Sequence, residues 1–188
     1  MELDKAIKER HNIRNLRKGK KQDYRKIIEA IDSANKAPLA GNIASLHFIL
    51  ISDKEKIKEL AEASQQDFIA DVDFVVAVCS DRKTLEKHYY ERGKMYSRQQ
   101  AGAAIQNFLL KLTDLKLQSC WVGAFSGETV KRILGIPDNV DVEAIIPVGY
   151  ELGKPRKIEK PELDSMLFFD TYNNKLMKSR RMPESTRI

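Results

Sequence analysis

Short apolar runs alternate with amphipathic helical patterns along most of this chain. Residues 47–51, 74–79 and 144–149 are short, apolar and bounded by polar residues, which is typical of buried strands. Residues 24–34 and 94–117 place apolar side chains three or four positions apart, as one face of a helix requires. This alternation predicts a mixed α/β or α+β fold, and the periodicity does not choose between the two.

Local signals set the ends of several helices. Pro38 ends the first long helix because proline disfavours helical backbone at the residue before it. Ser126 can cap a helix that runs through Leu134, and Gly135 can end it. The other expected elements are helices over 2–9 and from Asp53 to about Gln66, a helix or ordered loop over 82–92, and a strand over 119–122.

Length and composition fit one globular domain. The chain has 188 residues, 42% of them hydrophobic and 32% charged. The acidic N-terminus argues against a signal peptide, and no stretch of about 20 apolar residues predicts a membrane span. Cys79 and Cys120 lie in or beside apolar runs, so we expect buried, reduced thiols and a cytoplasmic protein.

A cationic segment follows the first predicted helix. Arg10 and Arg14 flank Asn12, and guanidinium groups meet a phosphate monoester with paired hydrogen bonds. The amide of Asn12 could add a neutral donor. An alternative interpretation is that the two arginines are solvated or interact with the end of the helix.

Four separated segments together resemble the nitroreductase family of FMN-dependent oxidoreductases. The resemblance covers about residues 5–170 and implies an α+β, three-layer fold, with a central, mostly antiparallel sheet flanked by helices, in a homodimer. It also implies one FMN-binding domain over residues 1–170, followed by a basic C-terminal extension over 171–188. The segments are Arg10-His11-Asn12-Ile13-Arg14, Ala37-Pro38-Leu39-Ala40-Gly41-Asn42, Cys120-Trp121-Val122-Gly123-Ala124-Phe125, and the basic stretch 154–160.

By this resemblance, the first segment binds one end of the cofactor. Arg10 matches the phosphate-binding arginine, and Arg14 matches the basic residue that faces the N1–O2 edge of the flavin. His11 and Asn12 complete the motif, with Asn12 where the family usually has serine. A fixed cation near N1 and O2 would stabilise the negative charge that two-electron reduction places there.

The second segment would contact the flavin from the neighbouring subunit. The resemblance assigns this contact to Pro38, Leu39 and Ala40, and it places Asn42 in the same turn. Leu39 replaces a serine, which removes one hydrogen bond. Gln66 falls where many members have a glutamine that faces the flavin pyrimidine, although an exposed helical glutamine is an alternative.

The third and fourth segments would complete the site. The resemblance places the backbone N–H groups of Gly123 and Ala124 at flavin N5 and O4, where a bulky side chain would block hydride transfer. Lys157 and Lys160 are candidates for closing over the phosphate, with Arg156 as a nearby alternative.

The resemblance implies an enzyme that passes hydride from NADH or NADPH through flavin N5 to a small electron-poor acceptor. Nitroaromatics and quinones are the expected acceptors, by a ping-pong mechanism. No catalytic side chain and no metal ion is expected, because the chemistry occurs on the flavin of a homodimer with FMN at its interface. One alternative is dehalogenation or flavin fragmentation, with residues 82–98 as a candidate lid.

A second alternative is a non-enzymatic, basic module that binds nucleic acid. The net charge is +6, and basic residues concentrate in 17–21 and 178–181. The remaining charges are interleaved in sign, which is typical of solvated helix faces. We therefore expect neither nucleic acid nor a membrane as a partner.

Overall fold

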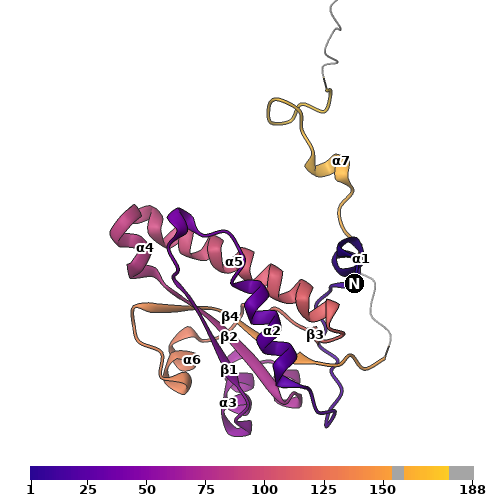
Figure 1. Ribbon diagram of the computed structural model, residues 1–188, viewed down its shortest axis with the longest axis vertical. Helices are drawn as coiled ribbons and strands as arrows, with labels where there is room; N and C mark the ends of the chain where they lie inside the picture. Colours follow the sequence, from indigo (N-terminus) through magenta and orange to yellow (C-terminus); the bar gives the residue numbers. More distant parts are fainter. Residues whose placement is uncertain (154–158, 178–188) are drawn as a thin grey trace, which may run out of the picture. The chain divides into compact units, whose positions relative to one another are not determined.

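A four-stranded antiparallel sheet forms the centre of residues 1–153 (Figure 1). The computed structural model describes residues 1–153 and 159–177, and the chain divides into two compact units, Met1–Pro155 and Arg156–Ile188. The strands lie in the order β1-β2-β4-β3. Their bounds are Leu46–Ile51 for β1, Phe74–Asp81 for β2, Gln118–Ser119 for β3 and Val140–Gly149 for β4.

Helices cover both faces of this sheet because successive side chains of a strand point to opposite faces. In β2, Val76 and Val78 pack in one core with α2 and α5, whereas Val75 and Ala77 pack in the other with α3 and α6. Three layers result, which confirms the expected α+β architecture with a mostly antiparallel sheet. The helices are α1 (Leu3–Glu9), α2 (Tyr24–Ala34), α3 (Lys54–Ser64), α4 (Arg82–Tyr89), α5 (Glu91–Asp114) and α6 (Gly127–Leu134), with short 3-10 turns η1 (Ala40–Asn42) and η2 (Asp67–Asp71).

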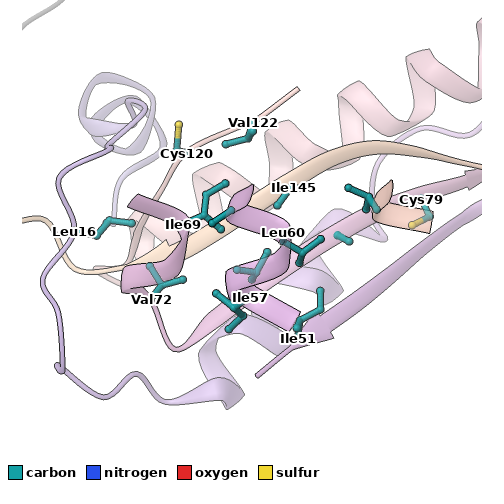
Figure 2. Packing of buried hydrophobic residues seen from close by; sticks show 14 of the residues in the cluster. Leu16, Ile51, Ile57, Leu60, Ile69, Val72, Cys79, Cys120, Val122 and Ile145 are labelled. Atoms are coloured by element: carbon teal, nitrogen blue, oxygen red, sulfur yellow. The ribbon is translucent and has the colours of Figure 1, made fainter. Parts of the chain in front are cut away.

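The core on the α3 side extends to the edge of the sheet near β3. Figure 2 shows Ile57 and Leu60 of α3 packed among the same buried residues as Ile69 of η2 and Cys120. All four side chains are fully buried. Burying an aliphatic side chain contributes about 1.5–3 kcal/mol, so this cluster fixes the backbone on either side of Cys120.

The strand expected over 119–122 is shorter than predicted. Ser119 pairs with Val148, and continuing that register sets Cys120 opposite Pro147. Proline has no N–H to donate to the ladder, so the regular strand ends at Ser119. Pairing resumes only as an isolated bridge, in which Val122 and Ile145 exchange two hydrogen bonds of 3.0 Å.

Several other boundaries follow the local signals. The helix expected over 24–34 coincides with α2, and Ser126 caps α6 by accepting from the N–H of Thr129. Gly135 ends α6 in the left-handed conformation at φ 66°, as a C-cap glycine does. Residues 82–92 contain α4, which settles the choice between helix and loop.

The second unit is small and has its own local contacts. It contains α7 (Leu163–Met166), and the rings of Phe168 and Tyr172 lie 4.9 Å apart. The Lys175 ammonium lies 4.1 Å from the centre of the Phe168 ring. The domain boundary expected at residue 170 stays a prediction.

Candidate functional site

The segment that carries Arg10 and Arg14 lies against the segment that leads to Gly123. The N–H of Ile13 donates to the carbonyl of Ser119 at 3.0 Å. A second hydrogen bond joins the same two segments: the N–H of Trp121 donates to Asn12 Oδ1 at 3.1 Å. Two motifs that are distant in the sequence are therefore adjacent in the fold.

Two cations of this segment have no carboxylate partner among the described residues. Arg14 is exposed and Arg10 is half-buried, and neither forms an ion pair within residues 1–153 and 159–177. By contrast, Lys18 pairs with Asp71 at 2.8 Å. The two guanidinium groups are thus available to an anionic ligand.

His11 is oriented by groups of the protein itself. Its Nδ1 lies 2.6 Å from the carbonyl oxygen of Glu9, and its Nε2 lies 3.7 Å from a carboxylate oxygen of Glu151. Nε2 is buried and has no hydrogen-bond partner in the described part of the chain. One ring nitrogen therefore contacts a backbone acceptor, and the other faces a carboxylate beyond hydrogen-bond distance.

Gly123 and Ala124 present open backbone. Both residues are exposed, and a Cβ added to Gly123 would meet no atom within 4 Å. Neither N–H group has an acceptor among the residues that the structure describes. An unpaired, exposed N–H can donate to a ligand without breaking an existing bond.

Gln66 lies just after the C-cap of α3, a helix that packs in the same core as Cys120 and Val122. The residue before it, Gln65, adopts a left-handed conformation at φ 53°, which ends the helix. Near this end of α3, the carbonyl of Ala63 accepts from the N–H of Ser126 at 2.9 Å. The end of α3 is thus hydrogen-bonded to Ser126, which follows the segment that contains Gly123, and Gln66 itself is half-buried.

The turn with Pro38, Leu39, Ala40 and Asn42 lies elsewhere in the same chain. A Cβ at Gly41 would collide with the hydroxyl of Tyr89, so the turn packs on α4, next to the start of α5. The segment after the turn is fixed farther along α5, where Ser45 donates to Gln100 at 3.0 Å.

The Arg10 segment instead lies near the opposite end of α5. Lys116, just after that helix, lies 3.9 Å from a carboxylate oxygen of Glu9. Figure 1 shows α4 and α1 at opposite ends of α5. A helix of 24 residues spans about 36 Å, so one chain does not bring the turn to Arg10.

The structure tests neither of the two lysines that were predicted to close over the phosphate. Lys157 lies outside the described residues, as does the alternative Arg156. Lys160 is exposed and belongs to the second unit. The roles of both lysines stay predictions.

Two residues that shape the site were not singled out from the sequence. Pro147 ends the ladder beside Cys120, and a proline inside an apolar run is a visible signal of such a break. Glu151 follows β4 and faces His11. A lone glutamate after a strand carries no comparable signal, because its partner lies in a different part of the sequence.

Both cysteines are buried, as expected, and no disulfide joins them. Burial, together with the nearby charge of Glu143, raises the pKa of Cys79 to about 11. Burial also raises the pKa of Cys120, although Arg14 partly opposes the shift. Neutral thiols at physiological pH are poor nucleophiles, so neither cysteine is placed for covalent catalysis.

The described residues hold no candidate metal cluster and no candidate membrane-spanning helix. Within residues 1–153 and 159–177, no three His, Cys, Asp or Glu side chains gather closely enough to hold a metal ion. Over the same ranges, no helix combines the length and the apolar character that crossing a bilayer requires.

The fold and the site define an α+β protein in which two arginines, unpaired within the described residues, lie on a segment hydrogen-bonded to the one that leads to exposed backbone N–H groups. Residues 62–150 match the sequence model of the Nitroreductase family. A protein of Archaeoglobus fulgidus, described as a putative NADH dehydrogenase/NAD(P)H nitroreductase, is 33% identical over 134 residues. The match covers 69% of this chain and 72% of that protein. The chain belongs to the nitroreductase family.

A second relative bears a different name. An iodotyrosine deiodinase of Thermotoga neapolitana is 26% identical over 159 residues, which are 76% of this chain and 85% of that protein.

Solved structures share the fold at lower identity. NfrA2 of B. megaterium superposes with a TM-score of 0.83 at 19% identity, over 92% of this chain and 76% of that chain. An FMN-dependent nitroreductase of Clostridium difficile gives a TM-score of 0.75 at 20% identity, over 89% of this chain and 98% of that chain. These likenesses establish the nitroreductase fold.

Proposed function

We propose that this protein is an FMN-dependent oxidoreductase that uses NADH or NADPH to reduce a small, electron-poor acceptor, such as a nitroaromatic compound or a quinone. Membership of the nitroreductase family supports this proposal. So do the printed names of two similar proteins, one an NAD(P)H nitroreductase and the other FMN-dependent. The proposal extends those activities to this chain.

One observation carries the proposal. The segment with Arg10 and Arg14 is hydrogen-bonded along the segment that leads to Gly123. Both arginines are unpaired within the described residues, and the Gly123 N–H is exposed and free there. A doubly charged phosphate requires the first feature, and the polar edge of a flavin ring requires the second, so the donor set fits FMN.

Each group has its own task. FMN, when bound, supplies the hydride chemistry at N5 that no side chain of the protein provides. The N–H groups of Gly123 and Ala124 donate hydrogen bonds at the ring edge, and the absence of a side chain at Gly123 leaves access from that side. Arg14 stabilises negative charge at N1 and O2, and Arg10 binds the phosphate, with Lys157 or Lys160 as a further cation.

Two copies of the chain would be needed for the complete site. Asn42 lies in a turn beside the start of α5, whereas the Arg10 segment lies near its end. The resemblance described above requires the turn in contact with the flavin. A homodimer with FMN at the interface meets this requirement, since the turn of one copy would reach the cations of the other.

The visible absorption spectrum tests this function most directly. We expect the purified protein to be yellow, or to become yellow with added FMN, and to bleach when NADH or NADPH is added without oxygen. A nitroaromatic acceptor should then restore the colour. Because one pocket serves both substrates in turn, double-reciprocal rate plots should be parallel. A protein that stays colourless with added FMN would contradict the proposal.

Reductive dehalogenation is the second candidate, since the chain is similar to an iodotyrosine deiodinase. The candidate lid over 82–98 consists of α4 and the start of α5, with the rings of Tyr89 and Tyr96 in edge contact at 5.0 Å. Iodide release from iodotyrosine by the reduced enzyme, measured beside nitroaromatic reduction, separates the two candidates.

The basic-module alternative loses support from the fold of residues 17–21. Lys18 pairs with Asp71, and Lys20 lies 3.9 Å from the centre of the Tyr150 ring. Arg17 Nε donates to the carbonyl of Glu151 at 3.0 Å. Cations that are engaged in this way contribute less to a surface that binds phosphate backbones. The basic residues 178–181 lie outside the described residues.

A further inference from the structure

We infer that the corner between α4 and α5 recognises the electron acceptor, and that the ring of Tyr90 stacks on a flat aromatic compound that carries a negative charge. The inference rests on the proposed function, because this acceptor is the second substrate of the proposed oxidoreductase. It assigns a substrate class to the corner and a specificity-determining role to Tyr90.

Tyr90 alone connects the two helices. α4 ends at Tyr89 and α5 begins at Glu91, so a single residue supplies the change of direction at the corner (Figure 1). Its backbone has φ 49° and ψ −132°, a conformation that glycine adopts readily and that bulky residues rarely adopt. A tyrosine at this position therefore destabilises the folded chain relative to glycine.

The surrounding structure imposes this conformation. The N–H of Tyr90 donates to the carbonyl of Glu86 at 2.9 Å, and the carbonyl of Tyr90 accepts from the N–H of Gly93 at 2.9 Å. A Cβ on Gly93 would lie 2.6 Å from the Cα of Glu86, so the two helices meet backbone against backbone. The tight packing holds the corner in place, and the strain at Tyr90 persists for that reason.

The ring of Tyr90 contributes little to the packing of the fold. The residue is 81% exposed, and within the described residues its ring has no aromatic or cation–π partner. By contrast, the neighbouring Tyr89 is half-buried, and its ring is in edge contact with that of Tyr96. A side chain that strains the backbone and gains no burial is free to contact a ligand, and strained residues of this kind gather at functional sites.

The corner lies beside the turn that the proposed function places at the flavin of a second copy. The hydroxyl of Tyr89 occupies the space in which Gly41 would carry a Cβ, so the turn over 37–42 packs on the end of α4. Tyr90 follows directly in the chain. In the proposed homodimer, the corner of one copy therefore lies next to the pocket in which the other copy binds the acceptor.

Positive charge surrounds the corner. Residues 82–98 contain six basic and two acidic side chains, and the acidic residues Glu86 and Glu91 offset this charge only in part. Arg82 pairs with Asp141 at 2.9 Å. The other basic residues are exposed and form no ion pair within the described ranges: Lys83, Lys87, Arg92, Lys94 and Arg98. Such a surface attracts anions over about 10 Å at 0.1 M salt.

The electronic character of the ring favours the acceptor over the hydride donor. The phenol ring of tyrosine is electron-rich, and a nitroaromatic ring is electron-poor, so the two attract each other when they stack. The reduced nicotinamide ring is electron-rich and lacks this complementarity. Together with the cations, the ring selects an aromatic acceptor that carries a negative charge, such as a nitrobenzoate.

Three substitutions at Tyr90 separate the ring from the strain. Tyr90→Ala removes the ring and keeps a strained Cβ, Tyr90→Gly removes both, and Tyr90→Phe keeps both. We expect Tyr90→Ala and Tyr90→Gly to lower kcat/KM for 4-nitrobenzoate by about tenfold, the effect of one stacking contact, and Tyr90→Phe to change it little. Tyr24→Ala, which removes an exposed tyrosine of α2, is the control and should have no effect.

Thermal unfolding of the flavin-free protein provides a readout that needs no catalysis. Relief of the strain in Tyr90→Gly should raise the unfolding midpoint by about 2–4 °C, whereas Tyr90→Ala should not raise it. The same substitution should therefore stabilise the protein and weaken its reaction with the acceptor. No gain of stability in Tyr90→Gly would mean that the corner is not strained, and it would overturn the inference.

A pair of compounds of similar shape tests the charge. 4-Nitrobenzoate is an anion and 4-nitrobenzamide is neutral, and the change in the visible spectrum of the oxidised, FMN-loaded protein measures the dissociation constant of each. We expect tighter binding of the anion at low salt, and a smaller difference at high salt or in the Arg92→Gln, Lys94→Gln double variant. Equal dissociation constants at low salt would overturn the assignment of an anionic acceptor.

Reoxidation by O2 separates this inference from the proposed function. O2 has no ring to stack, so the reduced natural protein and all Tyr90 variants should react with it at the same rate. A protein that binds no FMN would overturn the proposed function, and the inference with it. If FMN binds and NADH or NADPH reduces it, but Tyr90→Ala reacts with 4-nitrobenzoate as the natural protein does, the proposed function stands and the role of Tyr90 is wrong.

Discussion

Asn12 Oδ1 accepts a hydrogen bond from the backbone N–H of Trp121 at 3.1 Å, across 109 residues of sequence. The next residue, Val122, exchanges both of its hydrogen bonds with Ile145 of β4, so the N–H of Trp121 points away from β4. An N–H without a ladder partner needs another acceptor, and the side chain of Asn12 provides it. One contact therefore fixes the cationic segment relative to the exposed N–H groups of Gly123 and Ala124.

Replacing Asn12 should separate stability from binding. Asn12→Ala leaves the Trp121 N–H without its acceptor, and we expect unfolding free energy to fall by about 1 kcal/mol. Asn12→Asp keeps an acceptor but adds a negative charge beside Arg10, so stability should change little while FMN affinity falls. Denaturant titration and flavin fluorescence measure the two effects. Equal stability of both variants would show that the bond has no structural role.

Removal of the Arg10 guanidinium should weaken the phosphate contact. We expect Arg10→Ala to lower FMN affinity by about 1.5–3 kcal/mol, the value of hydrogen bonds to a charged group. Fluorescence titration measures the change. Riboflavin affinity should be unaffected, and Arg25→Ala should leave FMN affinity unchanged, since Arg25 is an exposed residue beside Asp23. Unchanged FMN affinity in Arg10→Ala would make the phosphate assignment wrong.

Arg14 should act on the flavin potential. Without its charge, the reduced flavin loses stabilisation at N1 and O2, so Arg14→Ala should lower the two-electron potential by about 30 mV for each 1.4 kcal/mol lost. Equilibration with redox dyes measures this potential. Arg14→Lys keeps the charge and should have a smaller effect. A potential that is equal in all three proteins would place the cation away from the ring edge.

Two glycines of α5 should respond oppositely to the same substitution. A Cβ at Gly93 would lie 2.6 Å from the Cα of Glu86, so Gly93→Ala forces α4 and α5 apart and should lower unfolding free energy by about 2–4 kcal/mol. At Gly102 a Cβ meets nothing within 4 Å. Gly102→Ala should raise stability by about 0.5–1 kcal/mol, because alanine favours the helix. Thermal unfolding of the pair tests this packing.

Cys79 should make stability depend on alkaline pH. Its pKa is raised from 9.0 to about 11 by burial and by Glu143, whereas the thiol of the unfolded chain ionises near its ordinary value. The unfolded state therefore loses its proton first, and stability falls as pH rises from about 9 to about 11, by about 2–3 kcal/mol. Urea titrations at several pH values should show this loss in the natural protein and a smaller one in Cys79→Ala.

Thiol labelling gives an independent check of the same burial. The folded protein should react slowly with a thiol reagent at pH 8, and it should react at both cysteines once unfolded. Rapid labelling of the folded protein at Cys79 would mean that this thiol is accessible and that burial does not raise its pKa.

Local patterns predicted most of the secondary structure. The apolar periodicity of residues 24–34 predicted α2 with its observed bounds, because one side of that helix packs on a sheet and the other meets solvent. Ser126 and Gly135 predicted the ends of α6, since capping depends on residues adjacent in sequence. The strand over 119–122 was overestimated because its end depends on Pro147, which lies opposite in the sheet.

The candidate site also has features that residue types predict and features that depend on packing. The sequence by itself determined which cations and which glycine-bearing segment the chain contains, since guanidinium groups and side-chain-free backbone can be read from residue types. Only the tertiary structure decided that Arg10 and Arg14 have no carboxylate partner among the described residues, that His11 faces Glu151, and that the turn with Asn42 lies at the other end of α5. Contacts of this kind join residues that are distant in the sequence, and they form only when the packed layers bring their elements together.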